Sequence, residues 1–217
     1  MILTTIRIRV REICRAGVLM TETIIDFIRH GEPQGGSRFR GYTIDDPLTE
    51  KGWAQMLAAV RGERGWTQIA TSPLIRCRSF AESLGQKLGI PVEVDSRFKE
   101  VGFGSWEGFT REELKASHLR EYRAFYQDPV KNRPQGAEPL EEFFARVAEA
   151  YQVLLREHAG QHVLVVTHAG VVRAVLAHVL DADPRAAYRI VVENAAITRF
   201  KHGGQGSVLV FHNRAHL

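Results

Sequence analysis

The sequence predicts an α/β fold: a three-layer α/β/α sandwich with a mainly parallel central sheet and an inserted helical cap. Apolar, strand-like runs alternate with helical patterns from Thr23 to the end of the chain, which is typical of a parallel sheet covered by helices. Residues 97–145 lack a clear strand and hold 9 of the 19 aromatic residues, which predicts the cap. A chain of 217 residues, 44% of them hydrophobic, has room for one core and little more.

The first half of the chain predicts three strands and two helices. Residues 24–28 are apolar except for Asp26 and form a mostly buried strand. A helix is expected over 49–61, where apolar residues fall on one stripe, and a second strand over 66–71. Ser72 and Pro73 predict the start of the next helix, with Ser72 as its N-cap. That helix ends near Gly89, and residues 92–94 predict a third strand.

The second half begins with the cap and then returns to regular alternation. Thr110 and Glu113 form a capping-box pattern, so a short helix is expected to start there. A helix over 140–157 precedes a fully apolar strand over 163–166, and a helix over 169–180 follows it. Two final strands are expected over 195–200 and 207–211, joined at Gly203 and Gly204.

The net charge of +4 is concentrated in a short leader at residues 1–19. The leader carries four arginines and one glutamate, so residues 20–217 are nearly neutral, which argues against a nucleic-acid partner. The arginines interrupt every apolar run, so the leader is no signal peptide, and no apolar stretch is long enough to predict a membrane partner. The leader is either a disordered tail or extra strand, or a translated upstream segment with the start at Met20, which we favour. The domain is then 20–217.

Two cysteines, Cys14 and Cys77, give no disulfide framework, which predicts a reducing, cytoplasmic location. The sequence leaves a homodimer open beside a monomer.

Chemistry-bearing residues follow the predicted strands. The first strand leads into Arg29-His30-Gly31-Glu32, and the fully apolar strand leads into Thr167-His168-Ala169-Gly170. Arg76 lies in the first turn of the helix after the second strand, and a helix N-terminus favours anions. Ligands bind beyond the carboxyl ends of parallel strands, so these residues are expected to converge on one phosphoryl group.

Each of these residues also has a structural interpretation. A single histidine at a strand end is more often hydrogen-bonded and structural than catalytic, and a single arginine is more often a solvated surface charge. The repetition of the pattern at three strand ends favours a functional site over three separate structural roles. No metal-binding spacing is present, and His30 with Glu32 is a weak zinc pattern, so we predict neither a metal nor a cofactor.

Together the motifs resemble those of the histidine phosphatase (phosphoglycerate-mutase-like) superfamily, from about Thr23 to at least Arg173. The matching segments occur in the family order and at family spacing: 29–32, 46–52, 72–77, Glu100 with 103–108, and 165–170.

The resemblance implies a mechanism with named residues. His30 attacks phosphorus and becomes a phosphohistidine, Glu100 serves as general acid and then general base, and Arg29, Arg76 and His168 hold the phosphoryl oxygens. Many members place an asparagine six residues after the nucleophile, where this chain has Gly36 in a glycine-rich loop over 33–41. The substrate-binding residues expected on this basis are Arg29, Gly36, Arg40, Arg76, His168 and Ala169.

Within the family, the glycine-rich loop, Arg76-Cys77 and Phe80-Ala81-Glu82 are most similar to the α-ribazole phosphatase branch. The resemblance therefore implies α-ribazole 5′-phosphate as the substrate, in cobalamin nucleotide-loop assembly, and a small phosphorylated metabolite as the partner. The aromatic cap could stack a flat base, or its rings could be cap core. A broad-specificity sugar or nucleotide phosphatase, a phosphoglycerate mutase and a non-catalytic phosphate-binding module stay open as alternatives. A non-catalytic module would be expected to lack His30 or Glu100, and this chain has both.

Overall fold

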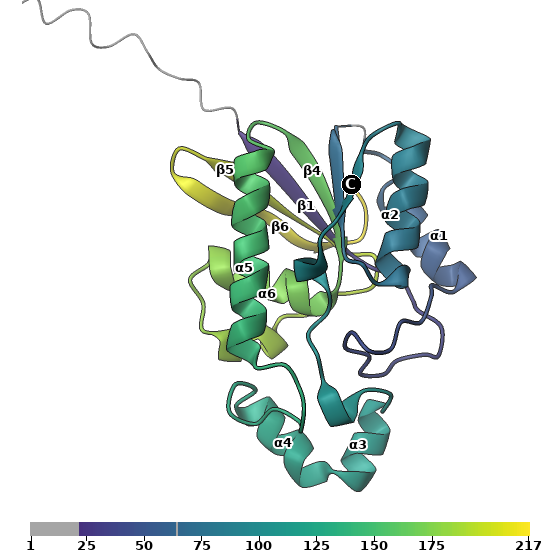
Figure 1. The fold of residues 1–217 in the computed structure, drawn as a ribbon, viewed down its shortest axis with the longest axis vertical. Coiled ribbons are helices and arrows are strands. Elements are labelled where there is room, and N and C mark those ends of the chain that lie inside the picture. The colour runs from purple at the N-terminus through teal and green to yellow at the C-terminus, as the bar shows by residue number, and fades with distance from the viewer. Residues whose placement is uncertain (1–21, 64) are drawn as a thin grey trace, which may run out of the picture.

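In the computed structural model, which describes residues 22–63 and 65–217, a six-stranded sheet has the order β3-β2-β4-β1-β5-β6 (Figure 1). The strands are β1 (Thr23–Arg29), β2 (Gln68–Thr71), β3 (Val92–Val94), β4 (His162–Thr167), β5 (Ile197–Gly203) and β6 (Gly206–Arg214). The first four strands are parallel to one another, whereas β5 pairs antiparallel with β1 and β6 with β5. The prediction of a mainly parallel sheet is confirmed. The predicted leader and Cys14 lie outside the described residues.

Helices cover both faces of the sheet and complete the three predicted layers. The helices against the sheet are α1 (Glu50–Ala59), α2 (Ile75–Leu88), α5 (Leu140–Glu157) and α6 (Ala169–Val179). Ile25 and Phe27 of β1 pack into the core formed with α5 and α6. Ile28 packs into a second core formed with α1 and α2. Alternate residues of a strand point to opposite faces, so one apolar strand supplies both cores.

The start of α2 differs from the prediction. The helix begins at Ile75 and its N-cap residue is Leu74, so Ser72 and Pro73 lie in the turn between β2 and the helix. Ser72 is fully buried, and its hydroxyl oxygen lies 2.7 Å from Nε2 of His168. A serine before a proline is a typical helix start. Here its side chain belongs to a hydrogen bond with a residue 96 positions later.

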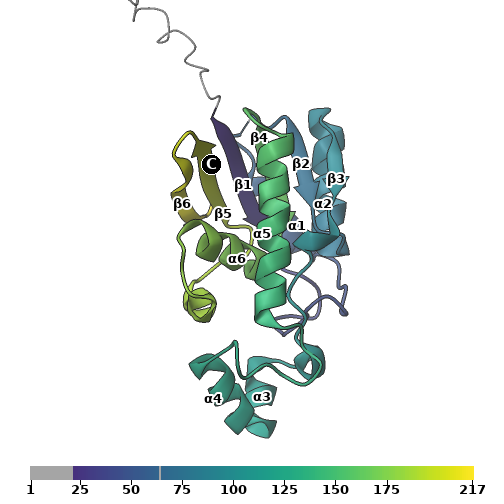
Figure 2. The ribbon, with the colours of Figure 1, turned by 60° about the vertical axis from the view of Figure 1, so that its left-hand side comes forward.

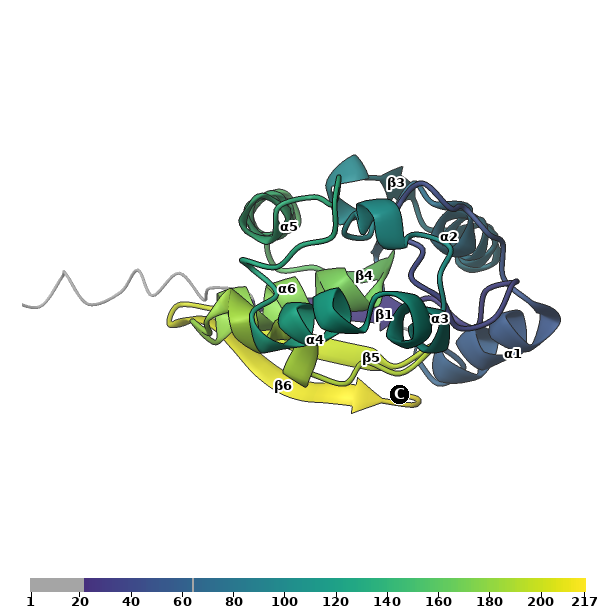
Figure 3. The same cartoon turned by 90° about the horizontal axis from the view of Figure 1, so that it is seen from below.

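The cap helices α3 (Arg111–Ser117) and α4 (Leu119–Gln127) lie apart from the other helices, beyond the carboxyl ends of the parallel strands (Figures 1 and 2). Seen from below, they lie in front of the sheet (Figure 3). The predicted capping box of Thr110 and Glu113 is present. Trp106 is 2% exposed and packs its ring 5.1 Å from that of Phe125, so the inner cap aromatics form core.

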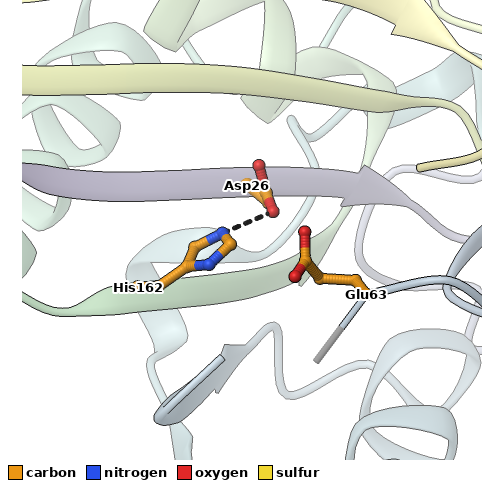
Figure 4. A group of neighbouring side chains, drawn as sticks. All are labelled: Asp26, Glu63 and His162. Carbon is orange, nitrogen blue, oxygen red and sulfur yellow. Dashed lines mark hydrogen bonds and ion pairs between the residues drawn. The ribbon is translucent and has the colours of Figure 1, made fainter. Parts of the chain in front are cut away.

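A buried ion network joins the central strands (Figure 4). Asp26 of β1 is completely buried and accepts hydrogen bonds from Arg199 of β5 at 2.7 and 2.9 Å and from Trp66 at 2.9 Å. Nε2 of His162 lies 2.8 Å from the same carboxylate, and Glu63 accepts from Arg199. Burial alone would raise the pKa of Asp26, but the hydrogen bonds from Arg199 and His162 outweigh it and lower the pKa. Arg199 already supplies the positive charge that these carboxylates require.

Three further short helices are of the 3₁₀ type: Ser96–Phe98, Gly104–Trp106 and Pro184–Arg189. Among the described residues, no helix combines the length and the apolar character that crossing a bilayer requires.

Candidate active site

The site lies at the carboxyl ends of three neighbouring strands. His30 follows β1, Ser72 follows β2 and His168 follows β4, and these strands are adjacent in the order β2-β4-β1. The ring centroids of His30 and His168 are 5.2 Å apart, with the planes inclined by 64°. The structure therefore brings the two predicted histidines together.

One ring nitrogen of His30 is held by a hydrogen bond, and the other has no hydrogen-bond partner among the described residues. Its Nδ1 lies 2.7 Å from the carbonyl oxygen of Gly31. A carbonyl can only accept, so Nδ1 carries the proton and Nε2 keeps its lone pair. Burial lowers the pKa of His30 well below its usual range, and the charges of Arg29 and Arg76 lower it further. The ring is therefore neutral near pH 7, as a nucleophile must be.

His168 lies behind His30 and does not line the cavity described below. Its ring is completely buried, with Nε2 bonded to Ser72 and the sulfur of Cys77 3.6 Å from the same nitrogen. Burial lowers the pKa of His168, and the charges of Arg76 and His30 add to the effect. Ala169, a predicted substrate-binding residue, does line the cavity. The sequence analysis did not predict that Ser72 and Cys77 contact His168. For Ser72 a signal was available, because it directly follows β2, as His30 and His168 directly follow their strands.

The half-buried Arg29 and the buried Arg76 are cations held by backbone carbonyls. Arg29 donates to the carbonyl of Val192 at 2.7 Å, and Arg76 donates to those of Gly41 and Ile44 at 2.9 and 3.0 Å. In both side chains Nε is buried without a partner among the described residues. Burial lowers the pKa of Arg29 to about 10, so the group stays charged at pH 7. Both side chains line the cavity, so an oxyanion bound there would lie beside two cations, which favours its binding.

Of the two loop residues predicted to bind substrate, Arg40 and Gly36, the structure places one at the cavity and one outside its lining. Arg40 is 8% exposed, lines the cavity and donates to Asp46 at 2.9 Å. Burial lowers the pKa of Arg40, although the bond with Asp46 opposes this. Gly36 does not line the cavity; its carbonyl accepts from Arg40 at 2.6 Å. The glycine-rich loop thus places an arginine at the site.

Glu100 is half-buried beside the N-terminus of α6 and also lines the cavity. Its carboxylate accepts from the backbone N–H of Val101 at 3.0 Å and from that of Gly170 at 3.4 Å. A β-carbon at Gly170 would overlap the Glu100 carboxylate, so the glycine makes room for it. The cavity therefore brings a carboxyl group to the same space as His30.

The cavity has a volume of about 520 Å³ and lies between the strand ends and the cap. Its aromatic residues are Phe39, Phe103, Tyr122, Tyr126 and Tyr188. Burial and the hydrogen bond with Tyr122 raise the pKa of Tyr126 to about 12. Three further arginines line the cavity: Arg38 of the glycine-rich loop, and Arg111 and Arg173, which the sequence did not identify as site residues. Arg111 and Arg173 lie in the helices α3 and α6, where the sequence alone does not distinguish a cavity-facing arginine from a solvated one.

Comparison with known proteins agrees with this arrangement. The bifunctional protein Rv2228c of Mycobacterium tuberculosis is 30% identical over 209 residues, which cover 93% of this chain and 57% of that protein. The chain thus spans little more than half of that relative's length. The putative phosphoserine phosphatase 2 of Hydrogenobacter thermophilus is 28% identical over 191 residues, covering 86% of this chain and 93% of the relative.

The fold is also found among solved structures. YhfR of Bacillus stearothermophilus matches with a TM-score of 0.78 at 28% identity, over 88% of this chain and 97% of that one. The family model of the histidine phosphatase superfamily (branch 1) matches residues 25–215, which include every residue of the site. The chain therefore belongs to the histidine phosphatase superfamily.

Proposed function

We propose that the protein hydrolyses phosphomonoesters through a phosphohistidine on His30, without a metal ion. The observation that carries the proposal is the state of His30 and its neighbours. The Nε2 atom of a neutral imidazole lies near two arginines, the half-buried Arg29 and the buried Arg76, and all three side chains line the same cavity. Fixed cations of this kind neutralise a phosphate and its transition state.

In the first step, Nε2 of His30 attacks phosphorus. The N–P bond forms as the ester P–O bond breaks, and Glu100 gives its proton to the departing oxygen. In the second step the Glu100 carboxylate takes a proton from water, the water oxygen bonds to phosphorus, and the N–P bond breaks to release phosphate. Arg29, Arg40 and Arg76 hold the phosphoryl oxygens throughout, and His168 supports His30 from behind.

The reaction is tested on the purified chain with an aryl phosphate in excess chelator. We expect turnover in the presence of chelator and its loss, by about 10⁴-fold or more, in His30→Ala. Rapid-quench samples with ³²P-labelled substrate should contain acid-labile, alkali-stable phosphate on the wild-type protein and none on His30→Ala. Chelator-sensitive turnover, or turnover without a phosphoenzyme, would contradict the mechanism.

For the substrate, we propose α-ribazole 5′-phosphate, in the cytoplasm. The support is the aromatic part of the cavity wall, where Tyr122 and Tyr126 of the cap can stack a flat base. Phe109 and Trp106 do not line the cavity, so the stacking argument rests on fewer rings than the sequence suggested. A panel of α-ribazole 5′-phosphate, 3-phosphoglycerate, and sugar and nucleotide monophosphates tests the proposal. Equal kcat/KM across the panel would favour the broad-specificity alternative, and phosphoryl transfer to a second hydroxyl would favour a mutase.

A further inference from the structure

The segment that carries Glu100 has no regular secondary structure of its own. Residues 99–103 lie between the 3₁₀ helices Ser96–Phe98 and Gly104–Trp106 and belong to neither a helix nor a strand. Among the described elements, none supplies a backbone hydrogen-bond ladder that would fix the position of Glu100, so side chains must bond this backbone instead. A general acid has to lie within hydrogen-bond reach of the departing oxygen, so the groups that hold this segment bear on the proposed reaction.

Arg146 of α5 bonds the backbone of this segment with a single side chain. Its Nη1 donates to the carbonyls of Arg97 and Lys99 at 2.5 and 3.0 Å. Its Nη2 donates to the carbonyl of Glu100 itself at 3.2 Å. One guanidinium therefore holds the chain that leads into Glu100, up to and including that residue.

The remaining N–H groups of Arg146 bond Glu138. Nε donates to Oε1 of Glu138 at 2.7 Å, and Nη2 donates to Oε2 at 2.9 Å. Oε2 also accepts from the backbone N–H of Gly102 at 3.1 Å, so the ion pair extends to the backbone on the other side of Glu100. The five hydrogen bonds of Arg146 use all five of its N–H groups. Lysine, with three donors on one nitrogen, cannot reproduce this planar fork.

Arg146 and Glu138 act on Glu100 from outside the active-site cavity. Their side chains are 17% and 13% exposed and do not belong to the cavity lining, so neither contacts the space in which a substrate would bind. The opposite charges are hydrogen-bonded to one another, so the field of the pair at Glu100 is weaker than that of a lone cation. The stem of Arg146 is also held, with its guanidinium 4.6 Å from the ring centroid of Phe143. The effect of Arg146 on Glu100 is therefore one of geometry.

We infer that Arg146 is a positioning residue for the reaction: its guanidinium, paired with Glu138, fixes the backbone on both sides of Glu100 and so places the carboxyl group at the cavity. This inference rests on the proposed function, in which Glu100 is the general acid. A displacement of about 1 Å in a reacting group can cost about 100-fold in rate. The loss should fall on protonation of the leaving group, because the phosphoryl-binding arginines are held by other carbonyls.

The test compares phosphate esters whose leaving groups differ in basicity: 4-nitrophenyl phosphate, phenyl phosphate and glycerol 2-phosphate. They are assayed with the wild-type protein and with Arg146→Lys, which keeps the charge and loses the fork. The measured quantity is kcat/KM, because it reports on the steps up to cleavage of the ester bond, in which Glu100 gives up its proton. We expect Arg146→Lys to lower kcat/KM by about 10- to 100-fold for glycerol 2-phosphate and by less than about three-fold for 4-nitrophenyl phosphate.

The matched control is Arg199→Lys, the same substitution at the buried carboxylate of Asp26. It should lower the urea midpoint of unfolding and change kcat/KM for the three esters by one common factor. A merely structural role of Arg146 would give this same pattern. Selective loss on the ester with the poorest leaving group therefore separates positioning from general destabilisation.

A double variant tests whether Arg146 acts through Glu100. On glycerol 2-phosphate, Arg146→Lys combined with Glu100→Gln should be within about two-fold of Glu100→Gln alone, because the acid that Arg146 positions is already absent. If Arg146→Lys fails to fold, Glu138→Gln takes its place, since it keeps the shape of the side chain and removes the ion pair. We expect about 10-fold selective loss in Glu138→Gln.

Two results would overturn the inference: losses within about two-fold of one another on all three esters, or a full additional loss in the double variant. Failure of the proposed function gives a different result. In that case the wild-type protein would not hydrolyse 4-nitrophenyl phosphate, or Glu100→Gln would slow all three esters equally. A selective loss in Glu100→Gln without one in Arg146→Lys would leave the proposed function standing and refute the role of Arg146 alone.

Discussion

Gly31 and Gly52 lie back to back, and neither has room for a side chain. A β-carbon at Gly31 would overlap the carbonyl of Gly52, and one at Gly52 would overlap the carbonyl of Glu32. The same carbonyl of Glu32 accepts from Thr49, the N-cap residue of α1, at 2.9 Å. The start of α1 is thus packed directly on the backbone that follows His30.

Gly31→Ala should therefore destabilise the protein and disturb the nucleophile. The new methyl group meets backbone, which cannot rotate away, so we expect a loss of about 3 kcal/mol in the free energy of unfolding. A shift of His30 by about 1 Å would lower kcat/KM for an aryl phosphate by about 100-fold. Chemical denaturation and steady-state kinetics measure the two effects. Gly204→Ala, where a β-carbon meets nothing within 4 Å, is the control. Wild-type behaviour of Gly31→Ala would refute the packing argument.

Gly170→Ala should affect activity more than stability, because its methyl group would meet the end of the Glu100 side chain, which can move, instead of backbone. We expect a change of less than about 1 kcal/mol in stability, since alanine also favours a helix. The displaced carboxyl group should slow alkyl phosphates by about 10-fold and aryl phosphates less, because good leaving groups need little protonation. Glu100→Gln should show the same selectivity more strongly. Equal losses on both substrates would argue against Glu100 as the general acid.

The buried histidines should make stability depend on pH. His30 and His168 have pKa values below the ordinary 6.5 in the folded state, so the unfolded chain binds these protons first. Their contribution is complete above pH 6.5 and is lost as the pH falls, by up to about 1.4 kcal/mol per pH unit for each ring. Urea titrations at pH 7, 6 and 5 measure this slope. His30→Gln should reduce it, whereas the exposed His216→Gln should not. Stability that rises on acidification would contradict the lowered pKa values.

Asp26→Asn should be strongly destabilising, because it removes the buried anion that Arg199 and His162 share and leaves Arg199 with the less buried Glu63 alone. Breaking such a buried pair costs about 3 kcal/mol or more. Glu82→Gln removes an exposed partner of Arg78 and should cost about 0.5 kcal/mol or less. Guanidinium denaturation of the two variants gives the comparison. Similar small losses in both would show that the network contributes little.

Much of the fold could be predicted from the sequence because its signals are local. The apolar strand over 163–166 and the capping box at Thr110 depend on neighbouring residues alone, and the structure has both. The meeting of His30 with His168 followed from one general rule for parallel sheets. The need for glycine at position 31 could not be predicted from its neighbours, because it comes from close contact with the backbone of Gly52 and not from a positive φ angle.

The features that could not be predicted from the sequence depend on contacts between segments that are far apart in the chain. Ser72 has the local pattern of a helix cap, and only the position of β4 shows that it bonds His168. Of the two loop residues expected to bind substrate, Arg40 lines the cavity and Gly36 does not. The environment of Arg173 is formed by Tyr188 and Ile190, which lie in a segment with no strand or helix pattern to place it.

The bond between Arg29 and Val192 spans 163 positions of the chain and has a consequence for biosynthesis. Arg29 leaves the ribosome early, but the carbonyl that holds its guanidinium is made near the end of translation. β5, which pairs with β1 beside it, is made later still. A nascent chain therefore carries His30, the proposed nucleophile, long before the proposed binding site for a phosphate ester is complete. Capacity to bind the ester should appear abruptly, after Val192 and β5 have emerged, and nascent chains stalled at earlier positions should lack it.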